Sequence, residues 1–239
     1  MRVVALWVAT TAAAVIGLVW AGWRLSKSTT YQVFGQLVRR VDTDDSVVAL
    51  TLDDGPSRVY TDSVLRILTD SNVHATFFVI GSSLARRPAL GRRMVEGRQE
   101  LGNHSYTHHR LVLKTPGYIR HEVEGTDSLI RAVGQEGAIP FRPPYGQRLL
   151  LLPWFLSRTN RLTVLWDVAA DSDPAIAGDA SRIVQYVVTH VRPGSIIALH
   201  AEIDSRTTGR EALPRLIGAL HAAGYRFVTV SDLLRRARS

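Results

Sequence analysis

Short apolar segments with the composition of β-strands recur seven times along this chain, and helical patterns separate them. The segment from Val47 to Leu52 is apolar and rich in β-branched residues, as expected of a strand buried on both faces. Alternation of this kind predicts an α/β fold around a parallel sheet, closed or nearly closed into a barrel. The predicted strands are Val47–Leu52, Ala75–Ile80, Glu100–Asn103, Ala138–Phe141, Leu162–Trp166, Ser195–His200 and Arg226–Thr229.

Two adjacent carboxylates, Asp53 and Asp54, follow the first of these strands, and Gly55-Pro56 ends the strand behind them. Barrel and open α/β enzymes carry their catalytic groups at the carboxyl ends of strands. Neighbouring carboxylates repel each other unless a cation lies beside them. We therefore expect a metal ion beside one of the two and an arginine beside the other.

Two histidines, His104 and His108, have the spacing of a metal-ligand pair. Residues four apart lie on one side of a helical turn, or of a tight loop that enters one, so both imidazoles can bind one ion. A catalytic zinc site takes three protein ligands and keeps its fourth position open for water. Asp53 and Asp54 are the obvious sources of the third ligand. The joint occurrence of these signals favours a metal-dependent hydrolase.

Four stretches of the chain follow a known order of motifs. They are Thr51-Leu52-Asp53-Asp54-Gly55-Pro56, His104-Ser105-Tyr106-Thr107-His108, Arg142-Pro143-Pro144-Tyr145 and Ile196-Ile197-Ala198-Leu199-His200. In these stretches the chain resembles the polysaccharide deacetylases of carbohydrate esterase family 4, which share a homology domain with nodulation-type chitooligosaccharide deacetylases. The resemblance covers about residues 31 to 232, with Leu52 where the family has Phe. It implies a distorted (β/α)7 barrel of parallel strands.

The resemblance also implies roles for the ionisable residues Asp53, Asp54, His104, His108 and Arg142 of the first three stretches. Asp54, His104 and His108 would bind the metal. Asp53 would be the general base that takes a proton from water. Arg142 would pair with Asp53 and keep it ionised.

The remaining motifs imply the groups that complete an amide hydrolysis. His200 would be the general acid, Asp171 would orient its imidazole, and the backbone N–H of Tyr145 would help to hold the oxyanion. The family's fourth motif lies between the third and the last of these stretches and is only partly present, because Asp171-Ser172 stands where relatives have Asp-Trp. The altered spacing leaves Asp173 as a second candidate for the partner of His200.

The implied activity is removal of N-acetyl groups, or of O-acetyl groups, from a polysaccharide. Candidate substrates are peptidoglycan, chitin oligomers and acetylated xylan, and a site of two imidazoles and one carboxylate suits Zn²⁺, Co²⁺, Mn²⁺ or Fe²⁺. A noncatalytic glycan-binding protein on the same fold is the main alternative, and Ser172 gives it some support. A serine esterase is excluded, because the chain has no G-x-S-x-G motif.

Composition limits the other classes of function. The net charge of +8 fits an anionic partner, but the arginines are scattered and lack interleaved aromatic residues. We therefore expect a solvated basic surface and no specific binding of nucleic acid. Anionic polymers of the cell envelope explain the positive charge equally well as partners. The absence of cysteine excludes disulfides, zinc fingers and thiol nucleophiles. The sequence does not define an oligomeric state.

The start of the chain has the pattern of a targeting segment. Residues 3–23 carry no charged side chain, and this is enough to cross a bilayer at about 1.5 Å per residue. We expect residues 1–27 to be a signal anchor or a signal peptide, residues 28–45 a linker with a short strand, and residues 46–239 the catalytic domain. The domain would then lie outside the cytoplasm, anchored to the cell membrane or secreted after cleavage.

Overall fold

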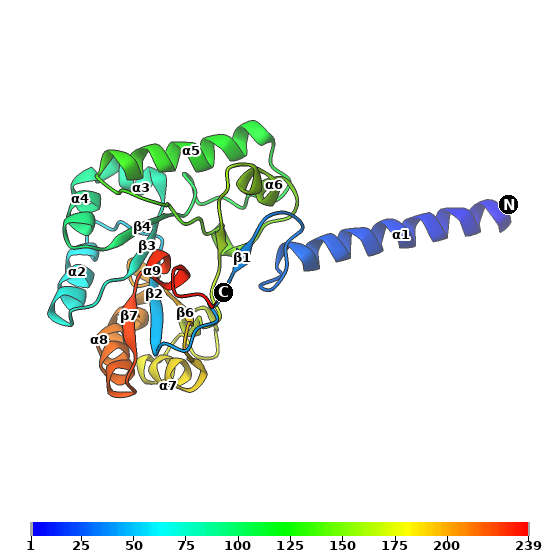
Figure 1. Ribbon diagram of the computed structural model, residues 1–239. Coiled ribbons are helices and arrows are strands. Elements are labelled where there is room, and N and C mark those ends of the chain that lie inside the picture. The colour runs from blue at the N-terminus through cyan, green and yellow to red at the C-terminus, as the bar shows by residue number, and fades with distance from the viewer. Residues whose placement is uncertain (1, 239) are drawn as a thin grey trace.

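A parallel β-sheet forms the centre of the molecule in the computed structural model, which describes residues 2–238 (Figure 1). Its strands are β2 (Val47–Asp53), β3 (Thr76–Val79), β4 (Glu100–Asn103), β6 (Ile196–Leu199) and β7 (Arg226–Val228). The order is β4-β3-β2-β6, and β7 also pairs with β2. Every one of these pairings is parallel, which confirms the predicted α/β fold with parallel strands.

Short pairings extend this sheet past β4 and β6 and bring its two edges close to forming a barrel. Strand β1 (Leu37–Val38) pairs with β5 (Thr163–Val164), and single parallel bridges join Phe141 to β4 and to β5, and Val168 to β6. The prediction of a strand at Ala138–Phe141 was wrong, because only Phe141 pairs. Pro140 has no N–H to donate, so a ladder cannot extend through it.

Strand β2 separates two apolar clusters because its side chains alternate between opposite faces. The cluster under the helices includes Val48, Leu50 and Leu52, and the cluster inside the barrel includes Val47, Ala49 and Phe78. The same alternation directs Thr51 and Asp53 into the barrel at the carboxyl end of the strand. The fold thus places a carboxylate at the top of an otherwise apolar interior.

Helices surround the sheet (Figure 1). They are α2 (Thr61–Asp70), α3 (Gly81–Arg86), α4 (Pro88–Glu96), α5 (Pro116–Ala132), α6 (Leu151–Arg158), α7 (Ala180–His190), α8 (Thr207–Ala222) and α9 (Val230–Leu234). Helix α5 begins at a Thr115 cap followed by Pro116, and α7 begins at an Asp179 cap. Val230 and Leu233 of α9 pack inside the barrel at the amino ends of the strands.

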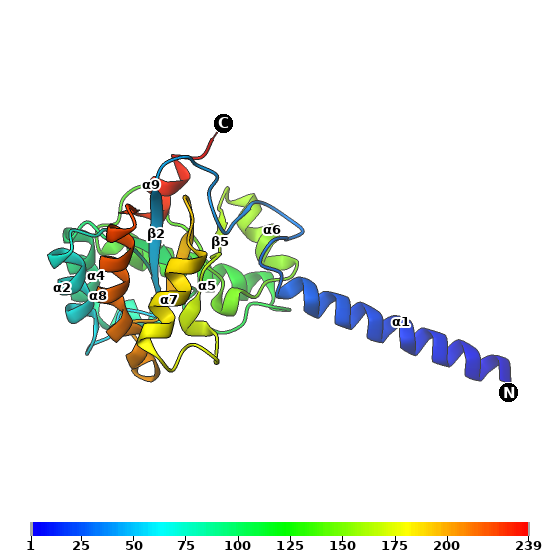
Figure 2. The ribbon, with the colours of Figure 1, turned by 90° about the horizontal axis from the view of Figure 1, so that it is seen from below.

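Helix α1 (Arg2–Ser26) projects away from the domain in both views (Figures 1 and 2). Trp7, Trp20 and Trp23 on this helix are exposed. Across the part of the chain that the structure describes, no helix has both the length and the apolar character that a membrane span requires. The expectation that residues 1–27 include a membrane-spanning helix is therefore not supported.

The segment of residues 28–45 lies against the domain. Arg148, which is buried, donates hydrogen bonds to Gln32 Oε1 at 3.0 Å, to the Ser28 carbonyl at 2.7 Å and to the Tyr31 carbonyl at 3.0 Å. Strand β1 follows, and Val41 N–H then donates to the Gly194 carbonyl at 2.9 Å. The segment predicted as a linker is thus bonded to the domain along much of its length.

Candidate active site

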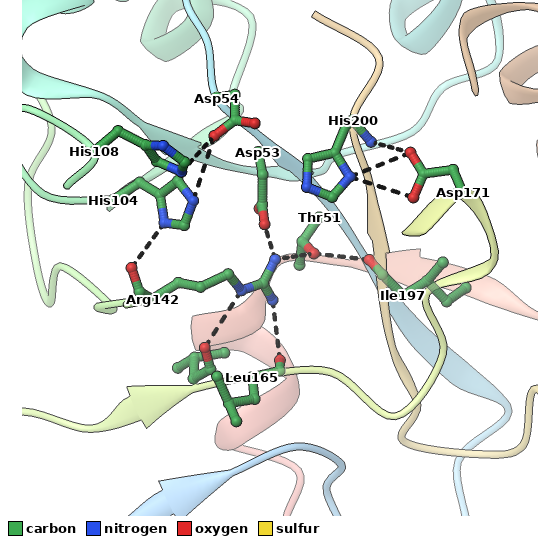
Figure 3. Close-up of polar contacts among 11 residues, drawn as sticks. Thr51, Asp53, Asp54, His104, His108, Arg142, Leu165, Asp171, Ile197 and His200 are labelled. Carbon is green, nitrogen blue, oxygen red and sulfur yellow. Dashed lines mark hydrogen bonds and ion pairs between the residues drawn. The ribbon is translucent and has the colours of Figure 1, made fainter. Parts of the chain in front are cut away.

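The predicted site residues meet at the carboxyl ends of the strands (Figure 3). Asp53 ends β2, and Asp54 follows it with a φ of 74°. His104 follows β4 directly, and His200 follows β6. Arg142 follows Phe141, which forms one bridge to β4 and one to β5. Residues from distant parts of the sequence therefore converge because parallel strands end at the same edge.

Asp54, His104 and His108 form a group that fits a metal ion, with ligand atoms all within 4.8 Å of one another. Asp54 Oδ1 lies 3.5 Å from His104 Nε2 and 3.0 Å from His108 Nε2. That oxygen is buried, yet neither imidazole gives it a well-aligned hydrogen bond. Burial alone would raise the pKa of Asp54, but the two imidazoles lower this pKa well below its usual value. A buried oxygen between two ring nitrogens is the donor set of a divalent cation.

The backbone of the histidine segment directs both rings to Asp54. His104 Nδ1 lies 2.7 Å from the Arg142 carbonyl, so Nδ1–H donates there and the Nε2 lone pair is free for a ligand bond. The segment that carries His108 is a loop rather than a helical turn. Ser105 and His108 both have positive φ values, 65° and 61°, a conformation that costs energy and concentrates at functional sites.

Asp53 is held by a buried arginine. Asp53 Oδ1 lies 2.7 Å from Arg142 Nη1, and Arg142 is completely buried. The guanidinium also donates to Thr51 Oγ1 at 2.7 Å and to the Leu165 carbonyl at 3.0 Å, and it lies 4.0 Å above the Phe78 ring. Burial lowers the pKa of Arg142, and the Asp53 carboxylate opposes that shift. Asp53 is thus fixed in orientation by a cation on one side.

His200 is paired with Asp171, not with Asp173. His200 Nδ1 lies 3.2 Å from Asp171 Oδ2, which also accepts the backbone N–H of His200 at 2.6 Å. Asp173 instead accepts a hydrogen bond from a backbone N–H two residues on. Burial alone would lower the pKa of His200, but Asp171, together with Asp53 and Asp54, raises it to about 9. The imidazole therefore carries a proton at neutral pH, as a general acid must.

A cavity of about 440 Å³ opens above these groups. Tyr145 stands at its mouth with a φ of 58°, about half exposed, and its ring centroid lies 4.9 Å from that of His108. Ser172, where the fourth motif departs from the family, also lines this cavity. The lining comprises Asp53, Asp54, His104, His108, Tyr145, Trp166, Ser172, His200, Ile203, Ser205 and Arg206.

Sequence analysis missed several residues of the site. Thr51, which accepts a hydrogen bond from Arg142, was detectable, because alternation in the strand places it on the face of Asp53. Ile203 and Arg206 line the cavity from the segment between β6 and α8. That segment has no periodic pattern that could have indicated its position.

Known proteins are similar to this chain in sequence and in fold. Residues 40–158 match the sequence profile of the polysaccharide deacetylase family. A peptidoglycan-N-acetylglucosamine deacetylase of Bacillus cereus is 30% identical over 201 residues, which cover 84% of this chain and 94% of the relative. A chitooligosaccharide deacetylase of Bradyrhizobium sp. is 35% identical over 191 residues, 74% of this chain and 86% of the relative.

A solved structure of a carbohydrate esterase family 4 pseudoenzyme from Bacillus anthracis is also similar. It matches with a TM-score of 0.75 and 26% identity, covering 87% of this chain and 72% of that one. The fold and the sequence matches together define a polysaccharide deacetylase domain. This chain belongs to the polysaccharide deacetylase family, which confirms the resemblance seen in its motifs.

Proposed function

We propose that this protein is a metal-dependent deacetylase that removes N-acetyl groups from an envelope or extracellular polysaccharide, such as peptidoglycan or a chitin oligomer. One observation carries the proposal. The group of Asp54, His104 and His108 lies beside a carboxylate paired with a buried arginine, Asp53, and beside a protonated imidazole, His200 (Figure 3). These are the base and the acid that amide hydrolysis requires. O-deacetylation would use the same groups.

The residues of the chain account for each proton transfer. Asp53, oriented by Arg142, takes a proton from the attacking water as the water oxygen bonds to the acetyl carbon. His200, oriented by Asp171, gives its proton to the amide nitrogen as the C–N bond breaks. The backbone N–H of Tyr145 donates to the acetyl oxygen while that oxygen carries negative charge. The products are acetate and a free amine on the sugar.

Asp54, His104 and His108 would hold the cation. When bound, it would lower the pKa of a water molecule and polarise the acetyl carbonyl. Zinc is our first choice, because two imidazoles, one carboxylate and an open position form a usual catalytic zinc site. The same donors suit Co²⁺, Mn²⁺ and Fe²⁺.

Acetate release tests the proposal. The purified full-length protein is incubated with peptidoglycan, chitooligosaccharides and acetylxylan, first after chelation and then with Zn²⁺, Co²⁺ or Mn²⁺ restored. We expect acetate from at least one N-acetylated substrate, loss of that activity on chelation and its recovery with metal. No acetate from any substrate with any metal would overturn the proposal.

A noncatalytic glycan-binding protein is the second candidate. The similarity to a pseudoenzyme of the same family supports it, as does Ser172 in the cavity wall. This candidate predicts glycan binding without acetate release under every metal condition. Retention of both Asp53 and His200 favours the enzyme, because binding alone requires neither group.

We also propose that the domain acts outside the cytoplasm. The support is that relatives are named for activity on peptidoglycan, an envelope polymer. Protease added to intact cells, or to spheroplasts, should then digest the domain while a cytoplasmic marker survives. Protection of the domain until the cells are lysed would contradict this location.

A further inference from the structure

Two arginines stand at the mouth of the catalytic cavity, and the proposed reaction does not use either of them. Arg206 lines the cavity together with Ser172 and His200. Arg110 is exposed, and its guanidinium carbon lies 4.5 Å from the centre of the ring of Tyr145, which lines the same cavity. One guanidinium therefore lies in the cavity wall with the acid His200, and another lies against the Tyr145 ring, which neighbours the proposed ligand His108.

The charges of both arginines are available to a ligand. Among the described residues, neither Arg110 nor Arg206 forms an ion pair with a carboxylate, whereas Arg142 and Arg161 do. Arg206 is anchored through Nη1, which donates to the carbonyl oxygen of Asp171. That bond engages the backbone and leaves the positive charge uncompensated. An anchored guanidinium with free N–H groups is suited to bind a carboxylate.

The acidic groups of the cavity already have partners of their own. Asp53 is paired with Arg142, Asp171 with His200, and Asp54 with the imidazoles of the proposed metal site. An anion at the mouth therefore meets the two arginines without a competing acid of the site. Ser172 and Arg206 both line the cavity, and Arg206 adds a cation to the wall next to Asp171.

We propose that Arg206 and Arg110 are specificity-determining residues that bind a carboxylate carried by a sugar next to the one that is deacetylated. The inference rests on the proposed function and narrows its substrate. The preferred polymer is a carboxylate-bearing glycan, such as a peptidoglycan strand with peptide carboxylates or, where the peptide is absent, free lactyl carboxylates, rather than a neutral chitin oligomer. The net charge of +8 acts in the same direction, because it attracts an anionic polymer to the surface.

The test compares one variant on two substrates. Arg206→Gln keeps a donor for the Asp171 carbonyl and removes the charge, and Arg206→Lys restores the charge. On a soluble peptidoglycan fragment with free carboxylates, Arg206→Gln should lower kcat/KM by about 10- to 100-fold, mainly through KM, because a charged hydrogen bond is lost. On a neutral N-acetylglucosamine oligomer the loss should stay within about threefold, since that substrate has no carboxylate to bind. Arg206→Lys should recover part of the difference.

A chemical variant of the substrate and a matched arginine serve as controls. Amidation of the carboxylates should weaken binding of the fragment to the native protein at least as much as Arg206→Gln does. Arg92 is exposed on α4, and Arg92→Gln should leave both substrates unaffected. Equal losses on both substrates with Arg206→Gln would show that this arginine only positions Asp171, and would overturn the inference.

Equilibrium binding separates this inference from the proposed function. The native protein should bind the carboxylate-bearing fragment more tightly than the amidated one, and Arg206→Gln should reduce the difference. If the protein binds in this way but releases no acetate with any metal, the inference stands and the enzymatic proposal fails. If acetate is released but amidation and Arg206→Gln change neither binding nor rate, the inference fails alone.

Discussion

The two ends of the barrel both bury carboxylates, but they satisfy them differently. At the amino ends of the strands, Glu100 accepts hydrogen bonds from Thr76 Oγ1 at 2.6 Å and from the Ser231 backbone N–H at 3.3 Å, and α9 closes the interior. At the carboxyl ends, Asp54 has a buried oxygen without a well-aligned donor. Hydrogen bonds within the fold thus satisfy Glu100 at the amino ends of the strands, the lower end of the barrel. They leave an oxygen of Asp54 without a donor at the carboxyl ends, the upper end.

Backbone conformation and cavity size do not by themselves separate the two ends. Asp54, Ser105, His108 and Tyr145 at the upper end have positive φ values, but so do Asn72, Arg98 and Asn160, in loops that precede strands. A larger but shallower depression of about 670 Å³ lies at the lower end, around Glu100. Size alone would therefore select the wrong end of the barrel. The unsatisfied Asp54 oxygen and the two histidines that lie against it identify the functional end.

A large effect is expected for the acid at the upper end. Asp171, together with Asp53 and Asp54, raises the pKa of His200 to about 9 against the opposing effect of burial, so activity should be maintained up to that pH and fall above it as the imidazole loses its proton. Asp171→Asn removes one of these charges, and the alkaline limb should move down by roughly two pH units, which lowers the rate at pH 9 by about 50-fold.

A matched control isolates this effect. Asp173→Asn changes a neighbouring exposed carboxylate that does not contact His200, and its pH profile should match that of the native protein. Rates at constant metal occupancy, measured from pH 6 to pH 10, supply the comparison. An alkaline limb that stays in place in Asp171→Asn would show that another group is the acid.

Glu202 is another buried carboxyl group at the functional end, and the proposed reaction does not use it. It accepts a hydrogen bond from Thr61, its Oε2 has no partner, and a Cβ at Gly55 would lie 1.7 Å from that oxygen. Burial raises the pKa of Glu202 to about 7, although the Thr61 hydrogen bond opposes the shift. The folded protein therefore holds this proton to a higher pH than the unfolded chain does.

The sign of the resulting pH dependence follows from that difference. Between the ordinary pKa of 4.5 and about 7, the unfolded chain releases the proton and the folded one keeps it, so the free energy of unfolding falls as pH rises. The total is roughly 3 kcal/mol. Glu202→Gln removes the titrating group, so its stability relative to the native protein should increase by that amount from pH 5 to pH 8. Urea unfolding of both proteins at the two pH values measures it, and a constant difference would contradict the account.

Glu100, at the lower end, should contribute to the stability of the protein and not to its activity. Glu100→Ala leaves Thr76 and the Ser231 N–H without their acceptor, so the free energy of unfolding should fall by about 1–3 kcal/mol. Glu100→Gln keeps one acceptor oxygen and should lose less. Acetate release per folded molecule should be unchanged in both, as measured well below the unfolding temperature. A large loss of turnover in a fully folded Glu100 variant would erase the distinction between the two ends.

The sequence predicted those parts of the site that depend on strand periodicity and motif spacing. The buried run of β2 placed Asp53 and Asp54 at a strand end, and β4 and β6 did the same for the histidines that follow them. Irregular segments could not be predicted in this way. Pro140 interrupts the expected strand before Phe141, and Arg206 reaches the cavity from a segment without periodicity.

The partner of His200 was also left open by the sequence. Asp171 and Asp173 are two residues apart, and only the 3₁₀ turn at residues 170–172 decides which carboxylate faces the imidazole. Backbone turns of this kind depend on tertiary contacts, so spacing alone cannot resolve such a choice.

The most direct test of the account is metal content measured beside deacetylation rate for variants of the two adjacent carboxylates. Asp54→Ala removes one of three proposed ligands, so both bound metal and activity should be lost. Asp53→Asn keeps the shape and the ligands, so metal should stay bound while the rate falls by roughly 10²- to 10⁴-fold, the usual contribution of a positioned general base. Loss of metal from both variants would make both carboxylates ligands. Full metal content and full rate in both would contradict the claim that this end of the barrel is the active site.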